Sequence, residues 1–458
     1  MKAIVVGGGI SGIAASYYLR EAGADVTLIE AGRQLGGRLA FARLGDRPIS
    51  LGGKNIGSRY TEFRKFCRAL GVDDFEYFGI NTSRVVNGRL VAFDQRKGWR
   101  ALYQLLASNA PRDLWRFFRF AQRIRRHPDD GFADSPFFHA VSARHDRPVL
   151  RDLFGARFCR DWIRPMVVRM NGAESDEVYL STFGSNLRVA LDSYDQLSSG
   201  MERLIEAFAT TVSVRLNTRV RALEVEDRRV RGVIVDDAGG HSQRLAADAV
   251  CVALPAPFAA ELAQPHAAEL AARLAQVRYF PVHVIVAHYR RPVFRPEIRA
   301  VLFDESHALS NAGAYGANDL ATVRYTFSGR AARPLIVQRI DNEALISLAE
   351  QTLSPYMPVD RRDRLHVTAH TFDPGLCAFA PDIEALNRAL DTQSALAGAV
   401  FTGDYRKGAS MEACFVAARA CTARLAAGAV HAAPQDTIRV PAPAAPSAAV
   451  GSGKTNPG

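Results

Sequence analysis

The feature that most constrains this 458-residue chain is a run of glycines directly after its first apolar segment. Residues 3–6 have the unbroken apolar composition of a short buried strand, and Gly7, Gly9 and Gly12 follow with the spacing Gly-x-Gly-x-x-Gly. The first glycine permits a tight turn, the second lets backbone approach a pyrophosphate, and the third lets a helix pack on the strand. Residues 13–22 have helical composition. The pattern therefore predicts a strand, a glycine turn and a helix that begins against a phosphate group.

The residues that follow extend this pattern to a dinucleotide site. Ser11 and the neighbouring backbone N–H groups lie at the predicted helix start, where the positive end of the helix dipole favours phosphate. Residues 25–30 predict a second strand, and Glu30 at its end is eighteen residues after Gly12. A carboxylate at this position accepts hydrogen bonds from ribose hydroxyls and disfavours a 2′-phosphate. The sequence thus predicts an α/β fold with a Rossmann-type, doubly wound parallel sheet.

A second glycine pair, Gly36 and Gly37, follows the predicted strand and is continued by Arg38. A fork-shaped guanidinium beside two glycines suits another contact with the pyrophosphate. At this point the sequence resembles the FAD-dependent amine oxidase superfamily, which includes flavin monoamine oxidases, protoporphyrinogen oxidases and phytoene desaturases. Those proteins carry the glycine motif, an acid and then Gly-Gly-Arg, in the order found here from Gly7 to Arg38.

Matches farther along the chain extend the resemblance to the C-terminal part. The strand that contains Val220 resembles the segment that touches adenine through a valine backbone. Gly403 and Asp404 resemble the motif whose acid binds the ribityl chain or pyrophosphate. Ser410 and Met411 resemble the start of a final helix that points at the flavin pyrimidine, where a helix N-terminus stabilises the negative charge of reduced flavin. The resemblance implies non-covalent FAD, because no cysteine stands in a matching context for a covalent link.

The resemblance also implies an architecture, and the changes in composition along the chain agree with it. It consists of an FAD-binding domain built from discontinuous segments and an α+β substrate domain with a sheet and a helical cap. We expect the FAD-binding domain to use three segments, and the Ala- and Pro-rich end to be a flexible tail. The expected ranges are 1–83, 196–275 and 396–430 for FAD binding, 84–195 for the cap, 276–395 for the substrate-domain sheet, and 431–458 for the tail.

The loop expected at the reactive edge of the flavin covers residues 51–57, where Gly53 and its neighbour Gly52 let backbone lie close to the ring. Lys54 stands where relatives often place an aromatic residue. It would polarise substrate, stabilise anionic reduced flavin, or be an ordinary exposed lysine. Amine-oxidising relatives often hold a lysine on a substrate-domain strand, and the matching strand here offers His283 instead. Lys54 and His283 are therefore the candidate catalytic residues, each with a purely structural alternative.

These features predict an FAD-dependent oxidoreductase that oxidises or desaturates a C–N or C–C bond of a small, largely apolar metabolite. The predicted step is hydride transfer to flavin N5. The missing strand lysine favours a dehydrogenase or desaturase over a plain amine oxidase. A redox-neutral flavin isomerase and a non-catalytic binding protein with the same fold stay open as alternatives. None of the six cysteines has metal-ligand spacing, so no metal is expected.

The charge distribution bears on partners. Of the net charge of +11, residues 84–169 contribute +10, from 18 Lys+Arg against 8 Asp+Glu. Such a local patch, without any nucleic-acid-binding signature, argues against nucleic acid as a partner. It is compatible with docking of an anionic or carrier-tethered substrate, with peripheral membrane contact through residues such as Trp115 and Phe118, or with a solvated arginine face. Widely spaced cysteines and the absence of a long apolar run predict a cytoplasmic protein.

Overall fold

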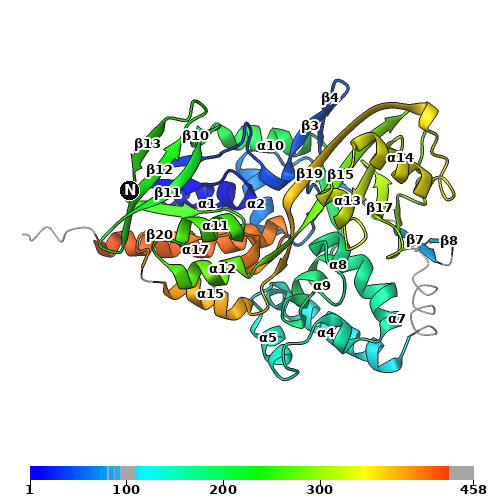
Figure 1. The fold of residues 1–458 in the computed structure, drawn as a ribbon, viewed down its shortest axis with the longest axis horizontal. Coiled ribbons are helices and arrows are strands. Elements are labelled where there is room, and N and C mark those ends of the chain that lie inside the picture. Colours follow the sequence, from blue (N-terminus) through cyan, green and yellow to red (C-terminus); the bar gives the residue numbers. More distant parts are fainter. Residues whose placement is uncertain (80–81, 87, 93–108, 394, 433–458) are drawn as a thin grey trace, which may run out of the picture.

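The computed structural model describes residues 1–79, 82–86, 88–92, 109–393 and 395–432 (Figure 1). Apart from its first two residues, the predicted flexible tail lies outside these ranges. Figure 1 shows a parallel sheet with its helices on the left, a second large sheet on the right, and a group of helices below the second sheet.

The parallel sheet combines strands from distant parts of the sequence, in the order β10-β2-β1-β14-β20. Every pairing in it is parallel. All four residues of β14 and the last four of β1 are buried, as expected for a sheet covered on both faces. This confirms the predicted Rossmann-type fold. The strands are β1 (Lys2–Val6), β2 (Asp25–Ile29), β10 (Ser213–Arg215), β14 (Ala249–Val252) and β20 (Ala399–Phe401).

Different elements cover the two faces of this sheet. On one face α1 (Ile10–Glu21) packs against α17 (Met411–Ala432), so the first and last helices share one hydrophobic core. On the other face lie two helices and a small antiparallel sheet, which share a second core with β1 and β14. These elements are β11 (Arg219–Glu226), β12 (Arg229–Asp236), β13 (Ser242–Ala246), α11 (Ala256–Ala263) and α12 (Ala268–Ala275).

The second large sheet has seven strands in the order β19-β15-β18-β17-β16-β7-β8. Its pairings are antiparallel except that of β16 with β7. The predicted boundary between residues 83 and 84 therefore falls inside a strand of this sheet. The strands are β7 (Thr82–Val86), β8 (Arg89–Ala92), β15 (Arg278–Tyr289), β16 (Ala300–Leu302), β17 (Leu309–Ala314), β18 (Thr322–Phe327) and β19 (Arg364–Phe379).

The two faces of the seven-stranded sheet have different neighbours. Alternate residues of β15 point to opposite faces, as in any strand. Val282, Val284 and Val286 pack with the β3–β4 hairpin, on what we call the inner face. Ile285 and Tyr289 pack in another core that includes helices α13 and α14, on the outer face. The hairpin strands and these helices are β3 (Phe41–Leu44), β4 (Arg47–Ser50), α13 (Arg333–Val337) and α14 (Asn342–Leu353).

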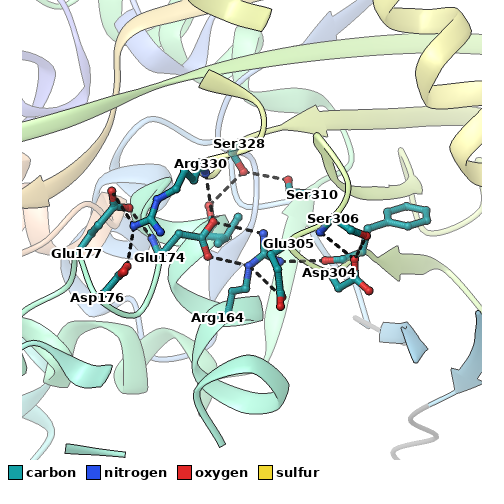
Figure 2. A network of polar contacts seen from close by, with 12 residues as sticks. Arg164, Glu174, Asp176, Glu177, Asp304, Glu305, Ser306, Ser310, Ser328 and Arg330 are labelled. Carbon is teal, nitrogen blue, oxygen red and sulfur yellow. Dashed lines mark hydrogen bonds and ion pairs between the residues drawn. The ribbon is translucent and has the colours of Figure 1, made fainter. Parts of the chain in front are cut away.

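The helices below this sheet form a cap with its own core. The cap is joined to the sheet by a buried ion pair, in which Arg164 Nε lies 2.7 Å from Glu174 Oε2 (Figure 2). Arg164 also donates to the carbonyl of Phe303, and Glu174 accepts from the backbone N–H of Arg330. The cap helices are α4 (Pro111–Arg126), α5 (Pro136–Ala143), α6 (Leu150–Leu153), α7 (Ala156–Phe158), α8 (Arg164–Asn171) and α9 (Phe183–Ala190).

Shorter elements connect these units. A three-stranded sheet, β5-β9-β6, lies between the N-terminal segment and the end of the cap. The remaining elements are β5 (Ile56–Gly57), α2 (Thr61–Ala69), β6 (Phe75–Tyr77), β9 (Tyr194–Leu197), α10 (Gly200–Ala209), α15 (Ile383–Thr392) and α16 (Asp404–Lys407).

One buried carboxylate joins the two ends of the chain. Glu412, in the first turn of α17, is 1% exposed. Its oxygens accept hydrogen bonds from the backbone N–H groups of Thr61, Glu62 and Phe63, each at 3.0 Å. These donors are the first N–H groups of α2, which have no partner within that helix. The Glu412 carboxylate therefore caps a helix that begins 351 residues earlier in the sequence.

We expect Glu412→Gln to lower the free energy of unfolding by about 2–3 kcal/mol, because an amide replaces a carboxylate that accepts charge-assisted hydrogen bonds. Thermal denaturation measures the effect. Glu206→Gln, on an exposed position of α10, is the matched control and leaves the melting temperature unchanged. Equal melting temperatures for both variants would contradict this role.

Candidate cofactor-binding and active site

The two predicted glycine loops lie directly on each other. The backbone N–H of Gly36 donates to the carbonyl of Gly8 at 2.9 Å, and Gly9 and Gly36 form an isolated parallel bridge. A Cβ atom added at Gly12 would lie 1.8 Å from the carbonyl oxygen of Gly7, so only glycine fits there. Gly37 continues the second loop. The sequence prediction of a close approach between helix and strand at Gly12 therefore has a direct steric cause.

The start of α1 is open to an anion. Gly9 is its N-cap, no side chain caps the helix, and its first turn contains no acid. The backbone N–H groups around Ser11 and Gly12 thus keep the capacity to bind phosphate oxygens. This uncapped helix start, beside two glycine loops, is the arrangement that a pyrophosphate requires.

Glu30 directly follows β2, next to this turn. Its two carboxylate oxygens accept hydrogen bonds from the backbone N–H groups of Gly8, at 2.7 Å, and Gly32, at 2.6 Å. The carboxylate is thereby fixed between the two loops. Val220 lies on β11, and the residue two places before it, Thr218, donates its N–H to the Glu30 carbonyl at 3.0 Å. The predicted ribose and adenine positions therefore lie on adjoining segments.

An ion pair connects the second glycine loop to the C-terminal segment. Arg38 Nη1 lies 2.5 Å from Asp404 Oδ2, and Asp404 is 3% exposed. The hydroxyl of Tyr279 donates to the other carboxylate oxygen at 2.7 Å. Burial alone would lower the pKa of Arg38, but Asp404 and Tyr279 raise it above its ordinary value. Tyr279 completes this group, and the sequence analysis did not single it out.

The other predicted C-terminal residues surround the same edge of the sheet. Gly403 is buried between β20 and Asp404, and Met411 is buried in the core shared by α1 and α17. The Ser410 hydroxyl accepts from the N–H of Ala413 at 3.2 Å, so it closes the first turn of α17. These residues meet the glycine loops because β20 and β1 both pair with β14, which aligns their carboxyl ends.

The predicted reactive loop packs on the Arg38 segment. The Gly52 N–H donates to the Leu39 carbonyl at 2.8 Å, and a Cβ at Gly52 would lie 2.0 Å from the Arg38 oxygen. From the other side, Arg324 of β18 donates to the Gly52 carbonyl at 2.7 Å. Gly53 is exposed and leads to Lys54. This loop therefore joins the dinucleotide edge to the inner face of the seven-stranded sheet.

Lys54 is enclosed rather than freely exposed. Its Nζ atom lies 3.9 Å from the ring centroid of Tyr315 and 4.9 Å from that of Phe78. It also lies 3.3 Å from Gln196 Oε1. Burial and the charge of Arg324 lower the pKa of Lys54 to about 7. The ammonium can therefore lose its proton near neutral pH, which an ordinary surface lysine cannot do.

His283 is a correction to the sequence analysis. The strand register pairs it with Phe327, and its Nδ1 atom lies 2.7 Å from Thr371 Oγ1. It therefore points to the outer face, away from Lys54. Its side chain is 4% exposed, and burial lowers its pKa to about 4. A neutral histidine in a hydrophobic layer is a structural residue, and the inner face at this point carries Val284 instead.

The convergence of these features at one edge of a parallel sheet is typical of the doubly wound class of proteins. Two glycine loops, an open helix start and a paired arginine and acid make up this edge. Among the described residues, no group of three or more histidine, cysteine or acidic side chains could hold a metal ion. Within the same ranges, no helix is long and apolar enough to cross a membrane.

The family can be stated from sequence comparison. The chain belongs to the flavin containing amine oxidoreductase family, which matches residues 10–426. It is 23% identical over 279 residues to a probable flavin-containing monoamine oxidase A of Dictyostelium discoideum, covering 57% of this chain and 58% of that protein. It is 25% identical over 440 residues to coproporphyrinogen III oxidase of Mycobacterium tuberculosis, covering 87% and 92%.

The chain spans only 58% and 50% of two of its curated relatives, the Dictyostelium protein and polyamine oxidase 4 of rice. Solved structures resemble it over nearly their whole length. Cyclohexylamine oxidase from Brevibacterium oxydans has a TM-score of 0.72 at 18% identity, with 93% of this chain and 98% of that one covered. A putative protoporphyrinogen oxidase from Exiguobacterium has a TM-score of 0.67 at 18% identity, with the same coverage. These likenesses show the fold.

We expect Asp404→Asn to reduce retained flavin, because Arg38 and Tyr279 both lose their carboxylate partner. A lost hydrogen bond to a charged group is worth about 1.5–3 kcal/mol, which corresponds to a roughly 10- to 100-fold weaker flavin affinity. The ratio of flavin to protein absorbance after gel filtration measures this change. Asp391→Asn removes another acid that pairs with an arginine, at the end of α15, and serves as the control.

The lowered pKa of Lys54 predicts a pH-dependent stability. Between pH 7 and the ordinary lysine pKa, the unfolded chain binds a proton that the folded chain lacks, so stability rises with pH in this window. Below pH 7 the folded state carries a partly buried charge. Lys54→Met should therefore raise the melting temperature more at pH 6 than at pH 9. An equal change at both pH values would contradict the lowered pKa.

Proposed function

We propose that this chain binds FAD without a covalent link and uses it to oxidise a C–N or C–C bond of a small metabolite. The observation that carries the proposal is the junction at Gly52. Its loop packs on the Arg38 segment of the dinucleotide edge, and Arg324 of the inner face holds it from the other side. One short stretch thus connects the cofactor edge to the surface on which a substrate would lie.

Two features support FAD rather than a smaller flavin. A dinucleotide needs a site for its adenosine half in addition to the pyrophosphate site. Glu30 and the segment that leads to Val220 adjoin at the end of β2, which suits that half. Burial raises the pKa of Cys414, the cysteine of the first turns of α17, to about 12. A thiol that stays protonated is a weak nucleophile, which supports non-covalent binding.

Bound FAD supplies a two-electron acceptor for a hydride equivalent. The chain's residues then have to orient the substrate C–H bond and exclude water. Val282, Val284 and Val286 are buried against the β3–β4 hairpin and keep water from this part of the inner face. Lys54, held between Tyr315 and Phe78, is placed to hold or release a proton beside that face. Because the inner face of β15 has no lysine, the arrangement supports a dehydrogenase or desaturase over a plain amine oxidase.

Anaerobic bleaching of the flavin tests the proposal. The purified holoprotein is mixed without oxygen with amines, amino acids, dihydropyrroles and polyenes, and the visible flavin band is followed. We expect at least one compound to bleach the flavin and to yield a product with a new C=N or C=C bond. Recolouring after air is admitted then separates an oxidase from a dehydrogenase.

Two results would overturn the proposal. The first is a purified protein without any flavin. The second is a rearranged product formed without bleaching or net oxidation, which would identify a redox-neutral isomerase. Lys54→Met is tested in parallel: we expect about a tenfold or greater loss of the bleaching rate, as typical for removal of a group that transfers a proton.

A further inference from the structure

The inner face of the seven-stranded sheet carries cations beyond Lys54. Strand register places Arg324 of β18 opposite Val286, so both point to the inner face. Arg84 of β7 is paired with Leu302 of the next strand. The row of paired residues continues across the sheet through Asn311 and Thr326 to Val284. Arg84 and Arg324 therefore share one face, about 14 Å apart across three strand spacings.

A third arginine comes from the cap. Arg169, near the end of α8, lies close enough to both strand arginines to affect their titration. Burial lowers the pKa of Arg84 and of Arg324 to about 10 each, and the charge of Arg169 contributes in both cases. Arg84 also stacks on Trp162, with 5.0 Å to the ring centroid. We call Arg84, Arg169 and Arg324, which these charge interactions connect, the arginine cluster.

Two members of this cluster lack acidic partners. Within the described ranges, Arg169 makes no ion pair, and Arg324 has only the Gly52 carbonyl as a hydrogen-bond acceptor. Some buried arginines elsewhere in the chain do have acidic partners. Arg164 pairs with Glu174 at 2.7 Å, and Arg364 pairs with Glu343 at 2.6 Å. Cations removed from water without a counter-charge are costly, which makes this cluster a site for an anion rather than a structural device.

We propose that the substrate carries a carboxylate group and that Arg169 and Arg324 bind it. This inference rests on the proposed function, which places the substrate between the inner face and the flavin. A planar carboxylate matches the fork of a guanidinium and can accept two hydrogen bonds from each. The carboxylate would lie toward the cap, and the oxidised bond would lie toward Lys54 and the Gly52 loop.

The same charges would act against an alternative substrate class. An alkylammonium ion placed beside Arg169, Arg324 and Lys54 would meet two permanent like charges and a partly protonated lysine, which disfavours binding. A nitrogen-containing substrate of this chain would therefore be an amino acid or another acid-bearing amine, in which the carboxylate offsets the cluster. Simple mono- and diamines would be poor substrates.

Binding of a matched set of aromatic probes tests the proposal without turnover. Benzoate, benzamide and benzylamine are titrated into the holoprotein, and the shift of the visible flavin spectrum gives each Kd. We expect benzoate to bind at least tenfold more tightly than benzamide or benzylamine. Arg169→Gln should weaken benzoate roughly 10- to 100-fold, as expected for a lost bond to a charged group, and leave benzamide unchanged.

Two controls distinguish an effect at the site from a general loss of charge or of stability. Arg119→Gln removes the same charge from an exposed position of α4, and benzoate affinity should not change. Arg324→Gln also breaks the contact with Gly52. Flavin content and melting temperature are therefore measured for each variant. If Arg324→Gln loses flavin, the benzoate affinity of Arg169→Gln alone tests the carboxylate site. Equal affinities for benzoate and benzamide, or no effect of Arg169→Gln, would overturn the carboxylate site.

The outcomes separate this inference from the proposed function. Flavin bleaching that is equally fast with acid-free and acid-bearing substrates would overturn the carboxylate site and leave the oxidoreductase standing. Arginine-dependent benzoate binding in a holoprotein that no compound bleaches would support the site and reject the proposed reaction. Tighter binding of phenylphosphonate than of benzoate would overturn the assignment to a carboxylate.

Discussion

The ion pair between Arg38 and Asp404 is the interaction on which the cofactor edge depends. Its partners are 366 residues apart in the sequence. They meet because β1 and β20, which come from opposite ends of the chain, both pair with β14. Tyr279, from the substrate-side sheet, shares the same carboxylate. Three chain segments thus converge on one acid. Glu412, in the first turn of α17, makes a similar long-range contact by capping α2. Polar contacts as well as the hydrophobic core therefore hold the N- and C-terminal segments together.

The cofactor half of the molecule could be predicted from sequence because its signals are local. Gly7, Gly12 and Glu30 lie within one strand–helix–strand unit, and their spacing carries the steric and electrostatic requirements of a phosphate-binding turn. The C-terminal residue Asp404 was found through the family resemblance. Tyr279 was not found, because nothing in its neighbourhood indicates that its hydroxyl reaches an acid contributed by another domain.

The substrate half could be predicted only in outline, since it depends on strand register. A shift of one residue moves every side chain of a strand to the other face. His283 and Val284 are neighbours in sequence, yet only Val284 lies on the inner face. Arg324 was missed for the same reason, because its role follows from its pairing with Val286 across the sheet. The net charge of +10 in residues 84–169 could be recognised from the sequence. The composition of that segment could not distinguish the inward-facing Arg84 and Arg169 from exposed arginines.

The cations of the inner face differ in how they respond to an anion. The arginines remain charged at any physiological pH, whereas Lys54, with a pKa of about 7, is divided between its two protonation states. Arg324 is one cause of that lowered pKa. An anion bound at Arg324 would offset this charge and raise the pKa of Lys54, so the lysine would gain a proton as the anion binds. The charge of Arg324 therefore couples anion binding to the protonation of Lys54. The same guanidinium also donates a hydrogen bond to the loop that leads to Lys54.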